Sequence, residues 1–248
     1  MCEFCNHSIH HTPIARRHVL KFAAAAAAGL VVAPQAEAAP PKAPPKAPPK
    51  PENVLSPDDA LKRLMEGNAR YVAGVSRRHD FTHERESLST GQNPFAAVLS
   101  CADSRIAPEY CFDVARGDVF VCRVAGNFAN DDIVASLEYA VAVLNTPLIM
   151  VLGHDACGAV DATIKSVKDN TTLPGHLPAL VEALRPAVEA AKSEPGDMLA
   201  NAIRRNVALN VGKLANAVPI LKAAADDKKI RVVGGVYELK TGKVQLLA

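Results

Sequence analysis

"PLIMVLGHDACGAVDATIKSV", residues 147–167, is the stretch of the chain that decides the fold. Its first part is a continuous apolar run that ends at His154, which is typical of a strand buried on both faces of a sheet. Its second part, from Ala156 onward, has the apolar spacing of a helix. A buried strand that leads directly into a helix is the repeating unit of a parallel sheet covered by helices. The stretch therefore predicts an α/β fold.

The segments on either side continue this alternation. A capped helix is predicted at 56–74, where Ser56 and Pro57 provide the start and Gly74 the stop. The other predicted elements are strands within 95–105 and 118–126, a helix at 131–145, a helical hairpin from Leu177 to Leu221, and a two-stranded ribbon at 230–248 around the turn KTGK. The predicted fold class is α/β, a mainly parallel β-sheet flanked by helices.

Polar side chains follow two of the predicted strands. Cys101 comes after the first run and His154 ends the third, and Cys157 starts the next helix three residues later. Ligands of parallel sheets collect at the carboxyl ends of the strands, so we expect these side chains to share one crevice. Two thiolates and an imidazole suit a catalytic zinc site, which leaves one position for water. Gly153 and Gly158 are expected to relieve crowding where the backbone approaches the metal.

The stretch CADSR, residues 101–105, adds a carboxylate and a guanidinium to this crevice. Asp103 and Arg105 are expected to form a charge-assisted pair in which the arginine keeps the carboxylate ionised and oriented. Two roles then stay open for Asp103. It either accepts a hydrogen bond from the metal-bound water or occupies the fourth zinc position itself.

Each of these pairs also has an ordinary structural interpretation. A histidine and a cysteine at this spacing, taken alone, are more often a polar core histidine beside a buried thiol. An isolated Asp-x-Arg is more often a salt bridge within a loop. Their occurrence together is what favours a metal centre.

Taken together, CADSR and GHDACG, residues 153–158, resemble the signature of the β-class carbonic anhydrases, C-x-D-x-R followed by H-x-x-C-G. The similarity continues through GNARYVAG, GDVFVCRVAGN, SLEYAVAVL and VVGGVYELKTGKV, so it spans most of residues 56–248. The resemblance implies reversible hydration of carbon dioxide to bicarbonate and a proton, with one zinc ion per subunit. The zinc ligands that it implies are Cys101, His154 and Cys157, with Asp103 and Arg105 as the catalytic pair.

The residues expected to line the pocket resemble those of the plant-like branch of this family. Gln92 stands nine residues before Cys101, at the place of a substrate-binding glutamine, and Phe128 and Tyr139 match further pocket positions. Backbone N–H groups near Gly158, at a helix start, are expected to stabilise negative oxygens of the substrate. The alternative for Gln92 is an exposed turn residue.

The resemblance also implies a homodimer or a multiple of dimers, with the pocket at or near the subunit interface. The apolar helix at 61–72 is then either an arm around a partner or a cover for its own subunit. Cys111 and Cys122 are either joined by a disulfide or buried as free thiols.

Composition excludes several other classes of partner. Residues 1–52 hold six of the 28 Lys and Arg and three of the 26 Asp and Glu, which leaves 22 basic and 23 acidic residues for the rest. A domain without a basic cluster is not suited to nucleic acid, because phosphate neutralisation needs clustered positive charge. Aromatic residues make up only 4% of the chain, and Trp is absent, so stacking platforms are hard to build.

The N-terminal segment has the order of an export signal. Arg16 and Arg17 precede Lys21 and an apolar run from Phe22 to Ala33, which resembles a twin-arginine signal. The run is too short for a stable membrane span, for which about 20 residues are needed, although an uncleaved membrane anchor is the alternative. The predicted organisation is a signal at 1–39, a Pro/Lys-rich linker at 40–53 and the zinc domain at 54–248, in a protein that is periplasmic or otherwise exported.

Two other functions compete with carbon dioxide hydration. The first is a noncatalytic zinc-binding module, structural or regulatory, in which Asp103 closes the metal site. The second is a related hydrolase of another small linear substrate, such as carbon disulfide. A thiol oxidoreductase is disfavoured because the C-x-x-C at residues 2–5 lies in the predicted signal.

Overall fold

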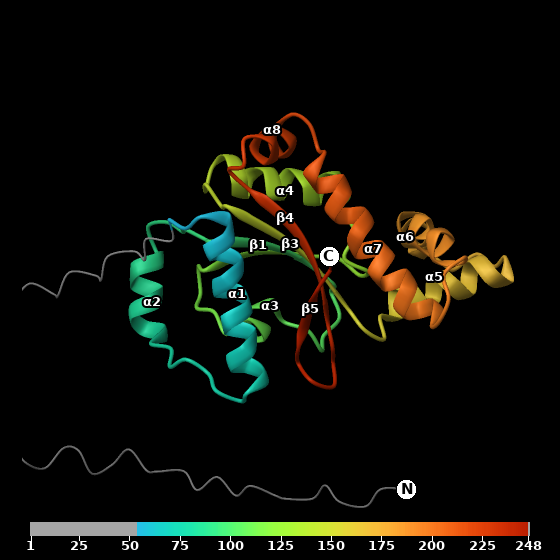
Figure 1. Cartoon of the computed structure of the whole chain (residues 1–248), viewed down its shortest axis with the longest axis horizontal. Helices are drawn as coiled ribbons and strands as arrows, with labels where there is room; N and C mark the ends of the chain where they lie inside the picture. Colours follow the sequence, from blue (N-terminus) through green and yellow to red (C-terminus); the bar gives the residue numbers. More distant parts are fainter. Residues whose placement is uncertain (1–53, 248) are drawn as a thin grey trace, which may run out of the picture. The chain divides into compact units, whose positions relative to one another are not determined.

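A computed structural model describes residues 54–247, so the predicted signal at 1–39 and linker at 40–53 lie outside the described residues. Within that range the elements follow one another as helices and strands of a single α/β arrangement (Figure 1). Their bounds are α1 Pro57–Val72, α2 Phe81–Leu88, β1 Ala96–Ser100, α3 Pro108–Cys111, β2 Val119–Arg123, α4 Asp131–Ala142, β3 Leu148–His154, α5 Gly158–Asp169, α6 Leu177–Ala191, α7 Met198–Ala215, α8 Ile220–Asp226, β4 Arg231–Tyr237 and β5 Val244–Leu246.

The five strands form one sheet in the order β2-β1-β3-β4-β5, in which only β5 is antiparallel to its neighbour. The predicted α/β fold with a mainly parallel sheet is confirmed. The predicted C-terminal ribbon also exists, but it is not separate from the sheet. β4 pairs with β3 in parallel over its whole length, from Arg231 beside Leu148 to Tyr237 beside His154.

The sheet is buried on both faces, as its continuous apolar strands predict. Along β3, Met150 faces the core under α1 and α3, whereas Ile149 and Val151 face the core under α4, α7 and α8. All three side chains are fully buried. This alternation follows from the two-residue period of a strand, which turns neighbouring side chains to opposite faces.

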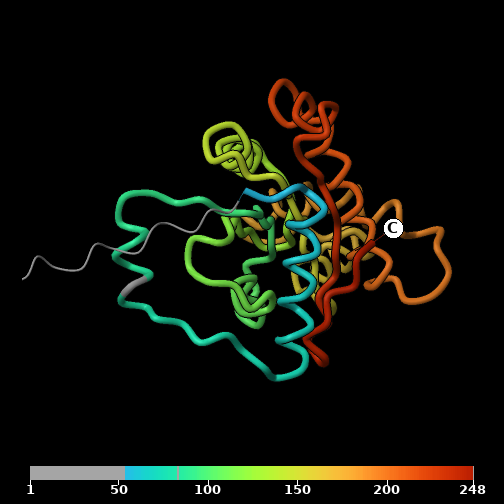
Figure 2. Tube along the Cα trace, turned by 60° about the vertical axis from the view of Figure 1, so that its left-hand side comes forward, coloured from blue at the N-terminus to red at the C-terminus, as the bar shows by residue number. Residues whose placement is uncertain are grey.

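Helix α1 covers its own subunit. Ser56 caps its start by accepting a hydrogen bond from the Asp59 N–H at 3.1 Å, and Leu64 packs in the core. Near its end the buried Asn68 donates to the carbonyls of Cys111 and Gly242, at 2.9 and 2.8 Å. These bonds fasten α1 to α3 and to the C-terminal hairpin, beside which α1 lies in Figures 1 and 2.

Among the residues from 54 to 247, every cysteine is a free, buried thiol: Cys101, Cys111, Cys122 and Cys157. Of the two alternatives for Cys111 and Cys122, the structure therefore has the free thiols. No helix in this part of the chain is long and apolar enough to cross a membrane.

Candidate metal centre and active site

Three elements bring the predicted metal ligands together at the carboxyl edge of the sheet. Cys101 follows β1 directly, His154 is the last residue of β3, and Cys157 precedes α5 as its N-cap residue. Their sulfur and ring nitrogen atoms all lie within 4.8 Å of one another. The side chains are almost completely buried, with residue exposures of 3%, 0% and 1%.

The turn between His154 and Cys157 is tight, and Ala156 carries its strain. Ala156 has a φ of +48°, a left-handed conformation that L-residues rarely adopt. The expectation that Gly153 makes room beside the metal is wrong, because a neighbouring helix fills the space next to it. A Cβ on Gly153 would lie 2.7 Å from the Val207 side chain, so this glycine is needed where β3 packs on α7, and Gly158 has open space around it.

The hydrogen bonds of His154 show that the site fits a metal. Nδ1 lies 2.8 Å from the backbone oxygen of Asp155, which can only accept, so Nδ1 carries the proton and Nε2 has a free lone pair. Nε2 is buried and has no hydrogen-bond partner among the described residues. Such a buried nitrogen is costly unless something binds to it. Two sulfurs and one imidazole nitrogen are the donor set that suits zinc.

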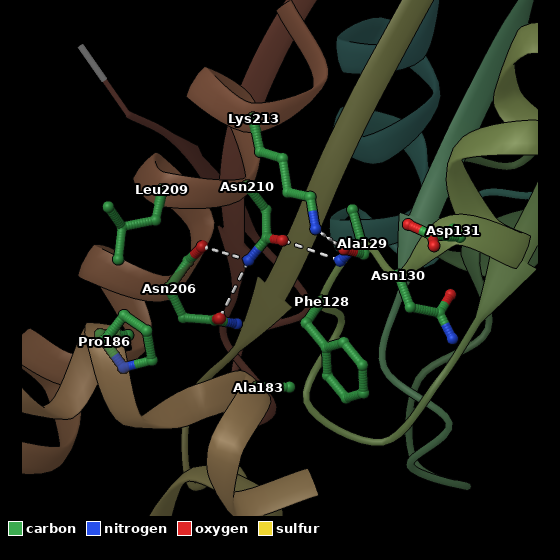
Figure 3. Close-up of a pocket in the computed structure, with 11 residues that line it drawn as sticks. Phe128, Ala129, Asn130, Asp131, Ala183, Pro186, Asn206, Leu209, Asn210 and Lys213 are labelled. Carbon is green, nitrogen blue, oxygen red and sulfur yellow. Dashed lines mark hydrogen bonds between the residues drawn. The ribbon is translucent and has the colours of Figure 1, made fainter. Parts of the chain in front are cut away.

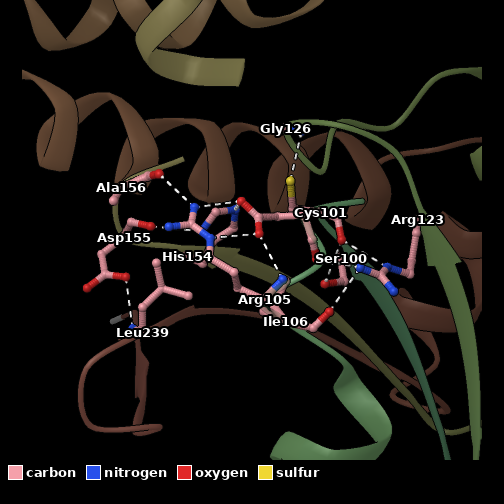
Figure 4. A network of polar contacts seen from close by, with 11 residues as sticks. Ser100, Cys101, Arg105, Ile106, Arg123, Gly126, His154, Asp155, Ala156 and Leu239 are labelled. Carbon is pink, nitrogen blue, oxygen red and sulfur yellow. Dashed lines mark hydrogen bonds and ion pairs between the residues drawn. The ribbon is translucent and has the colours of Figure 1, made fainter. Parts of the chain in front are cut away.

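Asp103 and Arg105 form the predicted ion pair at the edge of this cluster. Figure 4 shows Arg105 among the polar contacts near Cys101 and His154. The guanidinium donates from Nε to Oδ1 at 2.9 Å and from Nη2 to Oδ2 at 2.7 Å. These bonds hold the pKa of the Asp103 carboxyl well below its usual range and raise that of Arg105. Oδ2 lies 3.8 Å from Nε2 of His154, so an ionised carboxylate stands beside the three ligand atoms.

The two sulfur atoms differ in their surroundings. A hydrogen bond from the Cys157 thiol, with smaller contributions from His154 and the Gly126 N–H, lowers the pKa of Cys101 to about 4. The same bond and burial raise the pKa of Cys157. The surroundings thus favour the ionised form of Cys101 over that of Cys157, and a metal that binds both sulfurs must displace their remaining protons.

Arg123 supports the site and was missed by the sequence analysis. It ends β2 and donates to the backbone oxygens of Cys101, Asp103 and Ile106, at 3.0, 2.7 and 2.9 Å. It therefore clamps the loop that carries the first ligand and the ion pair. A charged residue inside the apolar run VFVCRVAG was the available signal.

The structure does not bring all predicted pocket residues to the cluster. Gln92 is exposed in the loop before β1, at the end of that strand opposite Cys101. Tyr139, on α4, is 47% exposed and contacts Phe120 near the start of β2, with ring centroids 6.3 Å apart. Both residues lie toward the amino ends of the strands, whereas the ligand atoms lie at the carboxyl ends.

Phe128 and Gly158 do lie on the metal side. Phe128 packs against the apolar cluster that contains Cys101 and Cys157. It also lines a cavity of about 480 Å³ between α6, α7 and the start of α4 (Figure 3). Gly158 is the first residue of α5, directly after Cys157.

A parallel sheet with a Cys₂His centre at its carboxyl edge and an ionised Asp–Arg pair beside it defines the class as a zinc enzyme of the β-carbonic anhydrase type. Comparison with known proteins agrees, because the family model described as carbonic anhydrase matches residues 96–244. The chain belongs to the carbonic anhydrase family and catalyses the reversible hydration of carbon dioxide, with zinc as cofactor.

Similar proteins cover most of the chain. Carbonic anhydrase 2 of Mycobacterium tuberculosis is 37% identical over 192 residues, which are 77% of this chain and 93% of that protein. The carbonic anhydrase of Mycolicibacterium smegmatis is 38% identical over 196 residues, with the same coverage. Among solved structures, the β-carbonic anhydrase CcaA matches with a TM-score of 0.58 and 28% identity, over 76% of this chain and 95% of that one. Two tetrameric β-carbonic anhydrases of Sordaria macrospora share the fold, with a TM-score of 0.60 for the chain that matches at 24% identity, over 77% of this chain and 98% of that one.

Proposed function

We propose that carbon dioxide is hydrated at the centre formed by Cys101, His154 and Cys157, with Asp103 and Arg105 as its catalytic pair. The observation that carries this proposal is the buried Nε2 of His154, which lacks a partner in the described part of the chain and lies near two sulfurs and an ionised carboxylate. Zinc, when bound, is the Lewis acid that makes water acidic enough to supply a nucleophile near neutral pH.

The protein's own groups position the reactants. The ionised Asp103 accepts a hydrogen bond from the attacking water and so turns its remaining proton away from the substrate. Arg105 fixes that carboxylate with two parallel bonds and keeps it ionised. Gly158 is the first residue of α5, and we expect the positive end of this helix to stabilise the product's negative oxygens.

Removal and return of zinc tests this function. The full chain, treated with a chelator, is expected to lose carbon dioxide hydration in a stopped-flow assay with a pH indicator, and stoichiometric zinc should restore it. A zinc-replete chain that hydrates no carbon dioxide would favour the noncatalytic module, in which Asp103 closes the site.

We further propose that the chain belongs to the plant-like branch and that Gln92 and Tyr139 serve the metal centre of a neighbouring subunit. They cannot serve their own, because β1 alone separates Gln92 from Cys101 by about 16 Å at 3.3 Å per residue. In an interface with twofold symmetry, each subunit can place residues from the amino ends of its strands at the metal centre of its partner. The homo-oligomer this requires is supported by the tetrameric Sordaria macrospora proteins of the same fold.

Mixing two inactive variants tests this arrangement. Gln92→Ala should lower turnover about 10²-fold or more, because a donor to the substrate is lost. When Gln92→Ala subunits exchange at random with Asp103→Asn subunits, one intact site forms in each mixed pair. Activity should rise to about a quarter of the wild-type value, since half of the pairs are mixed. A Gln92→Ala/Asp103→Asn double variant in place of the second partner is the control and should restore nothing. Equal activity of both mixtures would contradict the proposal.

We also propose that the chain is exported to the periplasm through the twin-arginine route. The paired Arg16 and Arg17 ahead of a short apolar run support this proposal. Replacing both by lysine should leave the protein in the cytoplasm of a bacterium that has this route, as measured by activity in separated cell fractions. An unchanged distribution would contradict it.

A further inference from the structure

The segment Gly126–Ala129, called here the sulfur loop, passes beside the metal centre. The Gly126 N–H donates to Sγ of Cys101 at 3.3 Å (Figure 4). The loop has an unusual backbone, because Gly126 and Asn127 have φ values of +83° and +42°. This conformation is easy for glycine, but in Asn127 it costs free energy that the surroundings must offset. The position of this N–H therefore depends on what holds the loop.

Two buried asparagines of α7 hold it. Asn206 and Asn210 lie one helical turn apart and are 2% and 7% exposed. Asn206 donates from Nδ2 to the Gly126 oxygen at 2.7 Å, and Asn210 accepts from the Ala129 N–H at 2.7 Å. Both ends of the sulfur loop are thereby tied to the same helix.

The two amides are also bonded to each other. Nδ2 of Asn210 donates to Oδ1 of Asn206 at 3.0 Å, so the orientation of one amide fixes the other. Lys213 adds a bond to the Ala129 oxygen at 2.6 Å. Figure 3 shows this row of side chains along α7, facing the backbone of the loop.

We propose that Asn206 is a positioning residue for the metal centre, which acts through Gly126 on the donor strength of the Cys101 sulfur. An N–H bond to a thiolate stabilises the ionised sulfur that binds a metal, and such outer contacts tune a metal and its affinity. Without Asn206 the buried Gly126 oxygen loses its donor, and the loop can carry its N–H away from the sulfur. The proposal rests on the zinc-ligand role proposed above for Cys101.

Asn201 provides a matched control on the same helix. It is 3% exposed and donates from Nδ2 to the Pro195 oxygen at 3.1 Å, so its loss also breaks a buried bond from an amide to a carbonyl. Its side-chain oxygen accepts a hydrogen bond from Arg204, and neither partner belongs to the sulfur loop. Asn201→Ala and Asn206→Ala therefore remove the same kind of bond, but only the second leads to the metal centre.

The experiment measures the metal itself rather than turnover. Full-length wild type, Asn206→Ala and Asn201→Ala are loaded with Co²⁺, and the absorption band for charge transfer from sulfur to cobalt is recorded. Zinc affinity is measured by competition with a chromophoric chelator. We expect Asn206→Ala to shift the band and to weaken zinc binding about 10- to 100-fold, the range of outer-contact changes at metal sites. Asn201→Ala should leave both within about twofold of the wild type.

A wild-type spectrum and affinity in Asn206→Ala, or equal changes in the two alanine variants, would overturn the proposal. If Asn206→Ala does not fold, Asn210→Ala is measured with the same expectation, because it removes the partner that orients Asn206. A different result is expected if Cys101 is not a zinc ligand. In that case the wild-type cobalt protein itself would lack the charge-transfer band.

Discussion

Cys157→Ser should lose zinc and carbon dioxide hydration together. Its sulfur is one of three ligand atoms that lie within 4.8 Å of one another, and the residue is 1% exposed. A serine hydroxyl is a poor zinc ligand at neutral pH because it stays protonated, so the remaining sulfur and nitrogen would hold the metal weakly. We expect bound zinc to fall to a small fraction of the wild-type amount. The hydration rate should fall about 10³-fold or more, which corresponds to about 4 kcal/mol.

Cys111→Ser is the matched control for this variant. Cys111 is another free cysteine, 2% exposed, but it lies in the core under α1 and belongs to no group of metal-type ligands in the described range. The control should lose stability while it keeps its zinc and its rate per folded subunit. Zinc is measured by elemental analysis of the gel-filtered protein, and hydration by stopped flow. A fully metallated and fully active Cys157→Ser protein would refute the ligand assignment.

Asp103→Asn is expected to keep zinc and to lose rate. The amide has nearly the volume of the carboxylate, but it carries no charge and cannot accept both bonds from Arg105. The attacking water then loses an ionised acceptor, and removal of such a group typically costs about 10²- to 10⁴-fold in rate. Stopped-flow hydration and zinc analysis on the same sample separate the two effects.

Asp113→Asn is the control for this second substitution. Asp113 is likewise paired with an arginine, Arg70, but it is buried and lies near the end of α1. Its pKa is held below the usual range despite burial, in part by that arginine. The control should lower stability and leave the rate of the folded protein unchanged. Unchanged turnover in Asp103→Asn would refute the assignment of Asp103 and Arg105 as the catalytic pair. Loss of zinc in this variant would indicate that Asp103 is a fourth zinc ligand.

The fold could be predicted as far as its signals are local. Continuous apolar runs indicated β1, β2 and β3, and cap residues indicated α1. The helix Phe81–Leu88 has no apolar stripe in FTHERESL, and Pro108–Cys111 is a single turn, so neither was predicted. The pairing of β4 with β3 joins segments about 80 residues apart, which no local pattern records.

For the site too, the local features could be predicted from the sequence, and the contacts between distant residues could not. The three metal-type side chains were predicted to meet because parallel strands end at one edge of a sheet. The contacts that orient them come from residues distant in sequence. Arg123 reaches Cys101 from β2, and Asn206 reaches Gly126 from 80 residues away. The position of Gln92 at the opposite edge required the three-dimensional structure, because its distance from Cys101 in the sequence does not give the direction of the strand between them.

X-ray absorption at the zinc edge of the zinc-loaded full chain is the most direct test of the metal centre. We expect a first shell of two sulfur atoms at about 2.3 Å and two lighter atoms at about 2.0–2.1 Å, one from His154 and one from solvent. In Cys157→Ser that retains any zinc, one sulfur should disappear from the shell. A wild-type shell without sulfur, or with a single sulfur, would contradict the account.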